Sequence, residues 1–309
     1  MPRYPQAILT SCEIPWDENE QLLEEVFRQE IRNAYTDFDH FYIFGTAGEG
    51  YAVDTPRFQQ IVEVFRDETK DLGEEKHVQV GIIGLSTANV VERMGFAYDA
   101  GFRIFQMSLP AWGELSDAEL LTYFTDVCGT FPDAQFLHYN LPRARRVLAA
   151  EHYRPLIDAV PNLVATKNTG HDEAGTRALV RDASELQHFL GERNLPFGLK
   201  EGECSLLSSW APLRAPKVVE FFEAAINGRD AEVSEFSRQF AGMIEDLLLS
   251  LAPGESRIDG AYDKVIVRLG GFEQMPLRLL SPYHGFTEEA FQASKRILHE
   301  RYPEWAPSE

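Results

Sequence analysis

The sequence predicts an α/β fold, a (β/α)8 TIM barrel that continues into a C-terminal α-helical extension. Eight short, mostly apolar segments alternate with longer amphipathic segments, which is the order expected of a closed parallel barrel. The first apolar segment leads into the sequence IPWD at residues 14–17, which is not a glycine-rich phosphate loop and so disfavours an open, doubly wound sheet. The length of 309 residues suits one large barrel with a tail, or two ordinary domains.

The predicted strands lie at residues 7–13, 40–45, 77–83, 103–109, 135–141, 163–169, 186–191 and 204–209. Helical patterns fall at residues 19–34, 56–72, 87–100, 116–130, 149–160 and 216–227. After Asn227 the strand pattern stops, and residues 230–251, 258–269 and 287–301 have helical periodicity. We therefore expect residues 1–228 to form the barrel that carries the active site and residues 229–309 to form a helical region packed on it.

Two of the predicted helices begin with recognisable capping sequences. Thr55 precedes Pro56, so we expect Thr55 to be the N-cap and Pro56 the first helical residue. Ser116 is followed three residues later by Glu119, which is the spacing of a capping box.

Composition and charge exclude several classes of function. The net charge of −20 makes nucleic acid and anionic membranes unfavourable partners, because little basic surface is available to replace their counterions. The three cysteines form no CxxC pair and the eight histidines no HExxH motif, so we expect neither a disulfide framework nor a metal site. The chain contains no apolar run of roughly 18 residues and no signal-peptide core, so we expect a cytoplasmic protein.

Lys167 lies near the carboxyl end of the sixth predicted strand, where the active sites of such barrels are formed. With a period of two, Leu163, Ala165 and Lys167 share one face of the strand. A lysine desolvated in the barrel mouth has a lowered pKa, and its free amine can attack a carbonyl group. The alternative is a lysine that extends from the strand end into solvent, and the strand pattern alone does not choose between the two.

Tyr139 and the segment GTAGEG at residues 45–50 are further candidates. Gln135, Leu137 and Tyr139 share one face of the fifth strand, so the phenol also reaches the mouth and could transfer protons there. A tyrosine that only packs in the core is the alternative. In GTAGEG, three glycines let backbone N–H groups converge on a carboxylate, and the Thr46 hydroxyl adds a donor. Alone, this segment could equally be a tight turn.

Three segments together resemble the motifs of the dihydrodipicolinate synthase/N-acetylneuraminate lyase family. GTAGEG at 45–50, YNLP at 139–142 and VATKNTG at 164–170 have the order and spacing of the family's G[TS]xGE, YNxP and IxKxxxG motifs. The resemblance covers most of the chain. It implies a TIM barrel in which Lys167 forms a Schiff base, Tyr139 transfers protons, and Thr46 and Ala47 bind the carboxylate of a 2-oxo acid.

The resemblance implies further site residues and an assembly. Gly191, Leu207 and Ser208 occupy positions that line the site, and Thr169 stands where the sugar-acid lyases of the family have a substrate-contacting threonine. It implies no metal and no organic cofactor, and a small 2-oxo acid as the partner molecule. It also implies a homotetramer assembled from dimers.

Three departures from the family pattern concern the substrate. Ala47 stands where the family usually has a second hydroxyl residue, so one donor is lost. Trp112 stands where the synthases have a tyrosine of a PYY-like motif, and an indole cannot relay a proton as a phenol does. We expect its apolar face to contact the substrate at the mouth. The alternative is that Trp112 packs at a subunit interface and that another phenol, Tyr51 or Tyr123, takes the relay role. Arg143 and Arg145 replace a single arginine; one of them could bind a distal carboxylate, or both could be solvated. We therefore expect little dihydrodipicolinate synthase activity.

The sequence thus predicts an enzyme, a class I Schiff-base lyase that acts as an aldolase or a dehydratase on a 2-oxo acid such as pyruvate. The alternative is a barrel that keeps the imine site only to bind a keto acid, as a sensor or regulatory protein. A phosphate-binding isomerase barrel is disfavoured, because no glycine-rich phosphate loop follows the seventh and eighth predicted strands.

Overall fold

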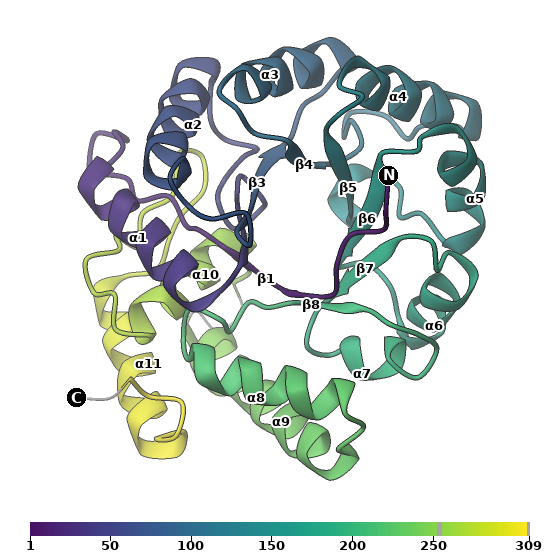
Figure 1. The fold of residues 1–309 in the computed structure, drawn as a ribbon. Coiled ribbons are helices and arrows are strands. Elements are labelled where there is room, and N and C mark those ends of the chain that lie inside the picture. Colours follow the sequence, from purple (N-terminus) through teal and green to yellow (C-terminus); the bar gives the residue numbers. More distant parts are fainter. Residues whose placement is uncertain (252–254, 308–309) are drawn as a thin grey trace.

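The computed structural model describes residues 1–251 and 255–307. Eight parallel strands form a closed barrel in which each strand pairs with the next and β8 pairs with β1. Figure 1 shows these strands as a ring surrounded by helices. The strands are β1 (Ile8–Ser11), β2 (His40–Ile43), β3 (His77–Ile82), β4 (Ile104–Met107), β5 (Gln135–Asn140), β6 (Leu163–Asn168), β7 (Gln187–Leu190) and β8 (Ser205–Leu207). The predicted fold class is confirmed.

The outer helices are α1 (Glu24–Asp37), α2 (Thr55–Thr69), α3 (Thr87–Asp99), α4 (Asp117–Thr130), α5 (Ala150–Ala159), α6 (Glu173–Asp182), α7 (Leu195–Gly198) and α8 (Ala215–Ile226). The sequence analysis did not identify α6 and α7. Helix α6 has only ten residues, of which Thr176, Leu179 and Val180 are buried, and α7 is a single turn. A single turn is too short to show helical periodicity, which explains the omission of α7. The buried residues of α6 do recur at helical spacing, and α5, which has the same length, was predicted, so α6 was identifiable from the sequence.

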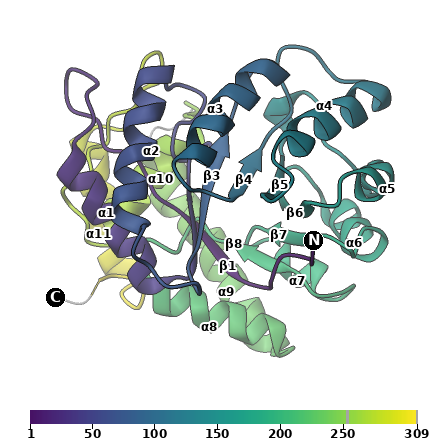
Figure 2. The same ribbon diagram turned by 45° about the horizontal axis from the view of Figure 1, so that its top comes forward.

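The C-terminal region consists of α9 (Asp230–Met243), α10 (Asp259–Leu269) and α11 (Glu288–Arg301). After α9 the chain continues as a π-helical segment, Ile244–Leu248, and a 3₁₀ turn, Leu249–Leu251, so the predicted helix at 230–251 changes its hydrogen-bond pattern near its end. Figures 1 and 2 both show α10 and α11 on the side of the barrel where α1 lies. A division of the chain at residues 228/229 stays a prediction, and residues 252–254 and 308–309 of the predicted helical region lie outside the described residues.

The N-cap of α2 differs from the prediction. Asp54, not Thr55, caps the helix: its backbone is extended and its carboxylate accepts a hydrogen bond from the N–H of Arg57 at 3.0 Å. Thr55 is therefore the first helical residue, and Pro56 fits the first turn because that turn needs no N–H from it. The capping box predicted at Ser116 and Glu119 is confirmed.

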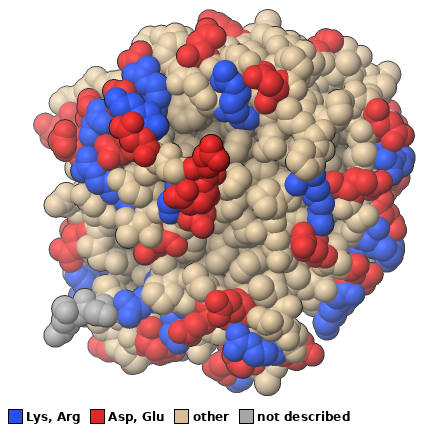
Figure 3. All heavy atoms as spheres, viewed as in Figure 1, with Lys and Arg blue, Asp and Glu red and all other residues tan. Residues whose placement is uncertain are grey.

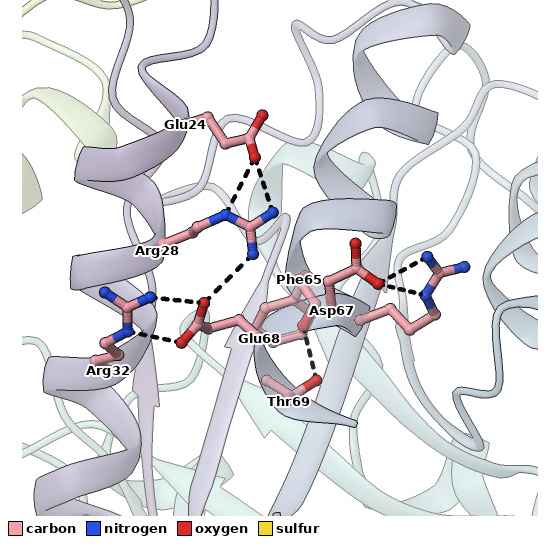
Figure 4. A network of polar contacts seen from close by, with 8 residues as sticks. Glu24, Arg28, Arg32, Phe65, Asp67, Glu68 and Thr69 are labelled. Atoms are coloured by element: carbon pink, nitrogen blue, oxygen red, sulfur yellow. Dashed lines mark hydrogen bonds and ion pairs between the residues drawn. The ribbon is translucent and has the colours of Figure 1, made fainter. Parts of the chain in front are cut away.

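Ion pairs on the outer surface join neighbouring helices. Figure 4 shows Arg28 between Glu24 and Glu68, while Arg32 donates to both oxygens of Glu68, so that two arginines of α1 hold one carboxylate of α2. On the face seen in Figure 3, acidic and basic side chains are interspersed and form no continuous basic patch. Among the described residues, none of the helices is both long and apolar enough to span a membrane.

Glu49, in the loop after β2, links the barrel to the C-terminal region. Its carboxylate accepts hydrogen bonds from Trp16 Nε1 at 2.9 Å, Lys264 Nζ at 2.6 Å and the N–H of Leu280 at 2.8 Å. The side chains of Glu49 and Lys264 are both fully buried. The packing of α10 therefore helps to hold this loop in position.

Replacing Glu49 with glutamine should lower the free energy of unfolding by about 3–5 kcal/mol, because the Lys264 ammonium would then be buried without a counter-charge. Urea denaturation measures this loss. Glu24→Gln is the matched control, since it breaks a surface pair with Arg28 and should cost less than about 1 kcal/mol. A similarly small loss for Glu49→Gln would contradict this role.

Candidate active site

Lys167 lies inside the barrel near the carboxyl end of β6 and is 2% exposed. Its Nζ lies between two phenol rings, 3.9 Å from the ring centroid of Tyr42 and 4.1 Å from that of Tyr139. It donates to the Tyr42 hydroxyl at 2.7 Å. Burial lowers the pKa of Lys167 to about 7, although the charges of Asp263 and Glu13 favour the ammonium form. The side chain thus points inward, and about half of the amines are neutral near pH 7.

The strand pattern around Lys167 differs in one detail from the prediction. Phe136 pairs with Leu163 and Leu137 pairs with Ala165, so the register skips Val164. Because a bulge inserts one extra residue into the strand, residues two apart on either side of it point to opposite faces of the sheet. Ala165 therefore lies in the apolar cluster of the barrel interior, whereas Leu163 packs in the cluster beneath the helices. The predicted shared face was wrong for Leu163.

Tyr139 and Thr46 lie beside Lys167. Tyr139 is the direct partner of Lys167 in the pairing of β5 with β6, and its hydroxyl lies 3.1 Å from Thr46 Oγ1. Both side chains are buried. Burial raises the pKa of Tyr139 to about 12, opposed by its hydrogen bond with Thr46, so the phenol stays protonated at neutral pH. The structure thus brings together the three residues that the sequence singled out for catalysis.

The loop that carries Thr46 is held in a constrained conformation. Phe44 and Glu49 both have left-handed backbone conformations, with φ of 63° and 53°. Residues other than glycine rarely adopt this conformation. A Cβ on Gly45 would lie 2.6 Å from Tyr42 Cε2 and 3.2 Å from Lys167 Nζ. Gly45 is needed because the backbone passes directly against the lysine, so this segment is more than a generic turn.

The site residues implied by the resemblance alone differ in their burial and in their contacts. Ala47 is buried next to Thr46 in the loop, and Leu207 packs in the barrel-interior cluster that contains Tyr42. Ser208 is buried and donates to Glu192 Oε1 at 2.8 Å, next to the partly exposed Gly191. Thr169 is exposed beyond the end of β6, where its N–H donates to Asn140.

The structure places Arg143, Arg145 and Trp112 in different surroundings. Arg143 lines a cavity there and forms a two-point ion pair with Asp259, with N···O distances of 2.9 and 3.0 Å. Arg145 instead donates to the carbonyl of Ala111. Trp112 is 85% exposed and does not line the cavity of its own chain, so the predicted contact of its indole with a substrate at this cavity is wrong, because the side chain points away from it into solvent.

The mouth cavity has a volume of about 410 Å³. The Thr46 side chain lies in its wall, and Ile258 and Tyr283 of the C-terminal region form another part. The Tyr51 hydroxyl is buried in this wall and has no hydrogen-bond partner among residues 1–251 and 255–307. The remaining lining is mostly apolar: Ile83, Ser108, Leu109, Ala111, Leu141, Arg143 and Ala144.

The sequence analysis missed several polar residues around Lys167. Tyr42 lies in β2, and Glu13 follows β1, so the strand-end rule that identified Lys167 could have identified both. Asp263 is different, because it lies on α10 and acts on Lys167 only through the packing of the C-terminal region. No local pattern in the sequence places it there.

Several solved structures have this fold. A Clostridium difficile protein, CdNal, solved with mannosamine, is 18% identical, with a TM-score of 0.82, covering 97% of this chain and 99% of its own. N-acetylneuraminate lyase from Fusobacterium nucleatum is 18% identical, with a TM-score of 0.81 and coverages of 96% and 98%. Dihydrodipicolinate synthase from Aquifex aeolicus is 17% identical, with a TM-score of 0.82 and coverages of 98% and 100%. At these identities the likeness shows the fold alone.

The sequence itself carries the family assignment. The model of the Dihydrodipicolinate synthetase family matches residues 4–299, which is nearly the whole chain. The resemblance noted in the three motifs is thereby confirmed. This chain belongs to the dihydrodipicolinate synthetase family and is an enzyme of the class I aldolase and lyase type.

Proposed function

We propose that this enzyme forms a Schiff base between Lys167 and a 2-oxo acid such as pyruvate, and that it makes or breaks a bond to the carbon next to the imine. The observation that carries the proposal is the buried amine of Lys167, whose pKa is lowered to about 7, at the end of a barrel strand. With its pKa lowered to about 7, a substantial fraction of the amine is neutral at physiological pH and can attack a keto group.

The neighbouring hydroxyls supply the other steps. Nζ of Lys167 attacks the keto carbon, and the Tyr139 phenol donates the proton with which the carbinolamine oxygen leaves as water. The protonated imine then accepts the electron pair of the bond between the adjacent carbon and a hydroxyl-bearing carbon. The Tyr139 phenolate, left by the previous step, takes the proton of that hydroxyl, so the products are an aldehyde and an enamine. Thr46, which lies 3.1 Å from the Tyr139 hydroxyl, orients the phenol and donates to the substrate carboxylate.

The cavity at the mouth supports a second substrate with an apolar or aromatic end. Its wall is mostly apolar, and its cationic group, Arg143, is already neutralised by Asp259. A second substrate with its own carboxylate would have to compete with Asp259 for that guanidinium. The Tyr51 hydroxyl is available to a single polar group on an otherwise apolar substrate.

A coupled pyruvate assay across a panel of substrates tests this function. We expect cleavage or condensation with apolar and aromatic aldehyde partners, and a kcat/KM for pyruvate with aspartate semialdehyde below about 10⁴ M⁻¹s⁻¹, which is low for a native substrate. Sugar acids and 4-hydroxy-2-oxo acids complete the panel. Efficient condensation with aspartate semialdehyde would refute the proposed substrate class. The absence of turnover with every substrate of the panel would refute the proposed lyase activity.

Replacing Thr46 with valine should raise the KM for the keto acid by about tenfold or more, because a hydrogen bond to a charged group is lost at a loop where Ala47 offers no second hydroxyl. Steady-state kinetics with pyruvate measures the change. Thr46→Ser restores the hydroxyl and should restore most of the binding. An unchanged KM in the valine variant would show that Thr46 does not bind the carboxylate of the keto acid.

We also propose that the enzyme acts in the cytoplasm as a homotetramer. The 85% exposed indole of Trp112 supports an assembly, because an exposed large aromatic side chain is typical of a contact with a partner. In such an assembly Trp112 would meet the neighbouring subunit rather than its own cavity. Sedimentation of the purified protein measures the oligomer.

A further inference from the structure

The nitrogen of Lys167 has two hydrogen-bond acceptors that no step of the proposed function uses. Nζ donates to the Tyr42 hydroxyl at 2.7 Å and to Oε1 of Gln106 at 3.4 Å. Gln106 lies in β4 and Tyr42 in β2, and both side chains are buried. Because Lys167 is buried as well, a positive charge on its nitrogen has to be stabilised by such groups rather than by bulk water.

Gln106 begins a chain of hydrogen bonds inside the barrel. Its Nε2 donates to Oε1 of Gln79 in β3 at 2.7 Å, and Nε2 of Gln79 donates to the Tyr4 hydroxyl at 2.8 Å. The Tyr4 hydroxyl lies 2.9 Å from Nδ1 of His40, the first residue of β2. Gln106, Gln79 and Tyr4 are no more than 2% exposed, so bulk water does not compete for these hydrogen bonds.

The N-terminal segment holds the far end of this chain. Figure 1 shows the segment running across the ring of strands before it enters β1. The N–H of Tyr4 donates to the carbonyl of Val164 in β6 at 3.3 Å. The Tyr4 ring meets three other rings edge-on: His40, His77 and Phe189. The backbone and the ring of Tyr4 therefore fix the position of its hydroxyl independently of the chain that the hydroxyl anchors.

All donors in the chain point away from Lys167. Burial lowers the pKa of His40 to about 4, so its ring is neutral at pH 7. With the ring proton on Nε2, Nδ1 accepts from the Tyr4 hydroxyl, whose oxygen accepts from Gln79. Each amide is thereby held with its oxygen toward the lysine. A half-turn of the Gln106 amide would present N–H groups to the cation, and it would break the bond to Gln79.

We propose that Gln106 is a catalytic residue that accepts the N–H of the protonated Lys167 imine, and that Gln79 and Tyr4 are positioning residues that keep its oxygen turned toward the nitrogen. The proposal rests on the proposed role of Lys167. When water leaves the carbinolamine, the nitrogen keeps one proton and becomes positively charged. An acceptor for that proton stabilises the protonated imine, which is the form that takes up the electron pair of the breaking bond.

The two acceptors differ in what they offer this proton. The Tyr42 hydroxyl carries a proton of its own and can turn it toward the nitrogen. Oε1 of Gln106 can only accept, because Nε2 of the same amide is bonded to Gln79. The amide oxygen is therefore the fixed acceptor beside the nitrogen, and Tyr42→Phe, which removes the other acceptor, serves as the comparison in the test.

The test measures how fast the preformed imine is reduced. The whole enzyme is incubated with saturating pyruvate and then treated with cyanoborohydride, which reduces protonated imines far faster than neutral ones. The mass of the protein gives the fraction reduced, at pH values from about 6 to about 9, around the lowered pKa of Lys167. At the upper end of this range, Gln106→Leu should be reduced at about a tenth of the wild-type rate, because a hydrogen bond to a charged group is lost.

Gln187→Leu is the matched control. Gln187 in β7 is a fully buried glutamine whose Nε2 donates to Ser205 rather than to a member of the chain. This variant also removes a buried amide from a barrel strand, and it should be reduced at the wild-type rate over the whole pH range.

Tyr4→Phe separates positioning from packing. It keeps the ring and removes the hydroxyl that accepts from Gln79, so reduction at the upper end of the pH range should slow by about threefold or more. The Tyr4→Phe/Gln106→Leu double variant should be no slower than Gln106→Leu, because Tyr4 acts through this amide. A purely structural role of Tyr4 would lower the melting temperature and leave the pH profile of reduction unchanged.

The outcomes are distinct. A wild-type protein that traps no pyruvate would refute the proposed function itself. If the wild type traps pyruvate, a Gln106→Leu rate within twofold of it at every pH would refute the role of Gln106 alone. So would an effect confined to Tyr42→Phe, or an equal slowing by Gln187→Leu. Effects of Tyr4→Phe and Gln106→Leu that multiply, or an unchanged profile of Tyr4→Phe, would refute the positioning. Should Gln106→Leu fail to fold, as judged by its melting temperature, Gln106→Met, which keeps the length of the side chain, and Tyr4→Phe decide.

Discussion

Replacing Lys167 with arginine should abolish the trapping of pyruvate by borohydride and lower turnover by at least about 10⁴-fold. The wild-type enzyme should gain one reduced pyruvyl group, located at Lys167 by peptide mass spectrometry. The physical reason is that a guanidinium stays protonated even when buried, so it has no free electron pair for the keto carbon. The charge and much of the length of the side chain are retained, which separates loss of the nucleophile from loss of a cation.

Two observations check this result. The trapping rate of the wild-type enzyme should rise with pH through about 7, and at pH 6 it should be roughly a tenth of its limit, because the lowered pKa of Lys167 sets the neutral fraction. Lys264 is the internal control, since it is also fully buried but paired with Glu49 at 2.6 Å, and it should remain unlabelled. Label that persists in Lys167→Arg, or that maps to Lys264, would refute the assignment.

Replacing Tyr139 with phenylalanine should lower kcat by about 10²–10⁴-fold, the usual size of a general acid–base contribution. The ring beside Nζ of Lys167 remains, so packing and the contact of the cation with the ring are retained. What is lost is the hydroxyl that bonds Thr46 and carries a proton for the carbinolamine. The decrease should appear in kcat more than in KM, because the phenol acts on the reaction rather than on binding.

Tyr123→Phe is the matched control for this variant. The Tyr123 phenol is also buried, but it donates to the carbonyl of Ser108. We expect its loss to leave kcat nearly unchanged. Far-ultraviolet circular dichroism establishes that both variants are folded. Near wild-type turnover of Tyr139→Phe on the native substrate would show that Tyr139 serves only in packing.

Much of the fold was predictable because its signals are local. Each barrel strand is a short apolar run, and each longer helix has a buried stripe that shows as periodicity over three or more turns. The predictions failed where an element was very short, or where two adjacent residues could both play the same local role. The single turn of α7 is too short to show a period, the carboxylate of Asp54 acts as the cap in place of Thr55, and the bulge at Val164 reverses the face of Leu163.

The sequence by itself determined the barrel and the family, and it predicted the three residues proposed for the imine chemistry: Lys167, Tyr139 and Thr46. It could do so because parallel strands align their carboxyl ends, so a residue's place in its strand already places it at the site. Only the tertiary structure decided which other groups act on the lysine. Glu13 follows β1, which does not pair with β6, and Asp263 comes from a helix about a hundred residues farther along the chain. Their effect on the pKa of Lys167 depends on distance and burial, which exist only once the C-terminal helices have packed against the barrel.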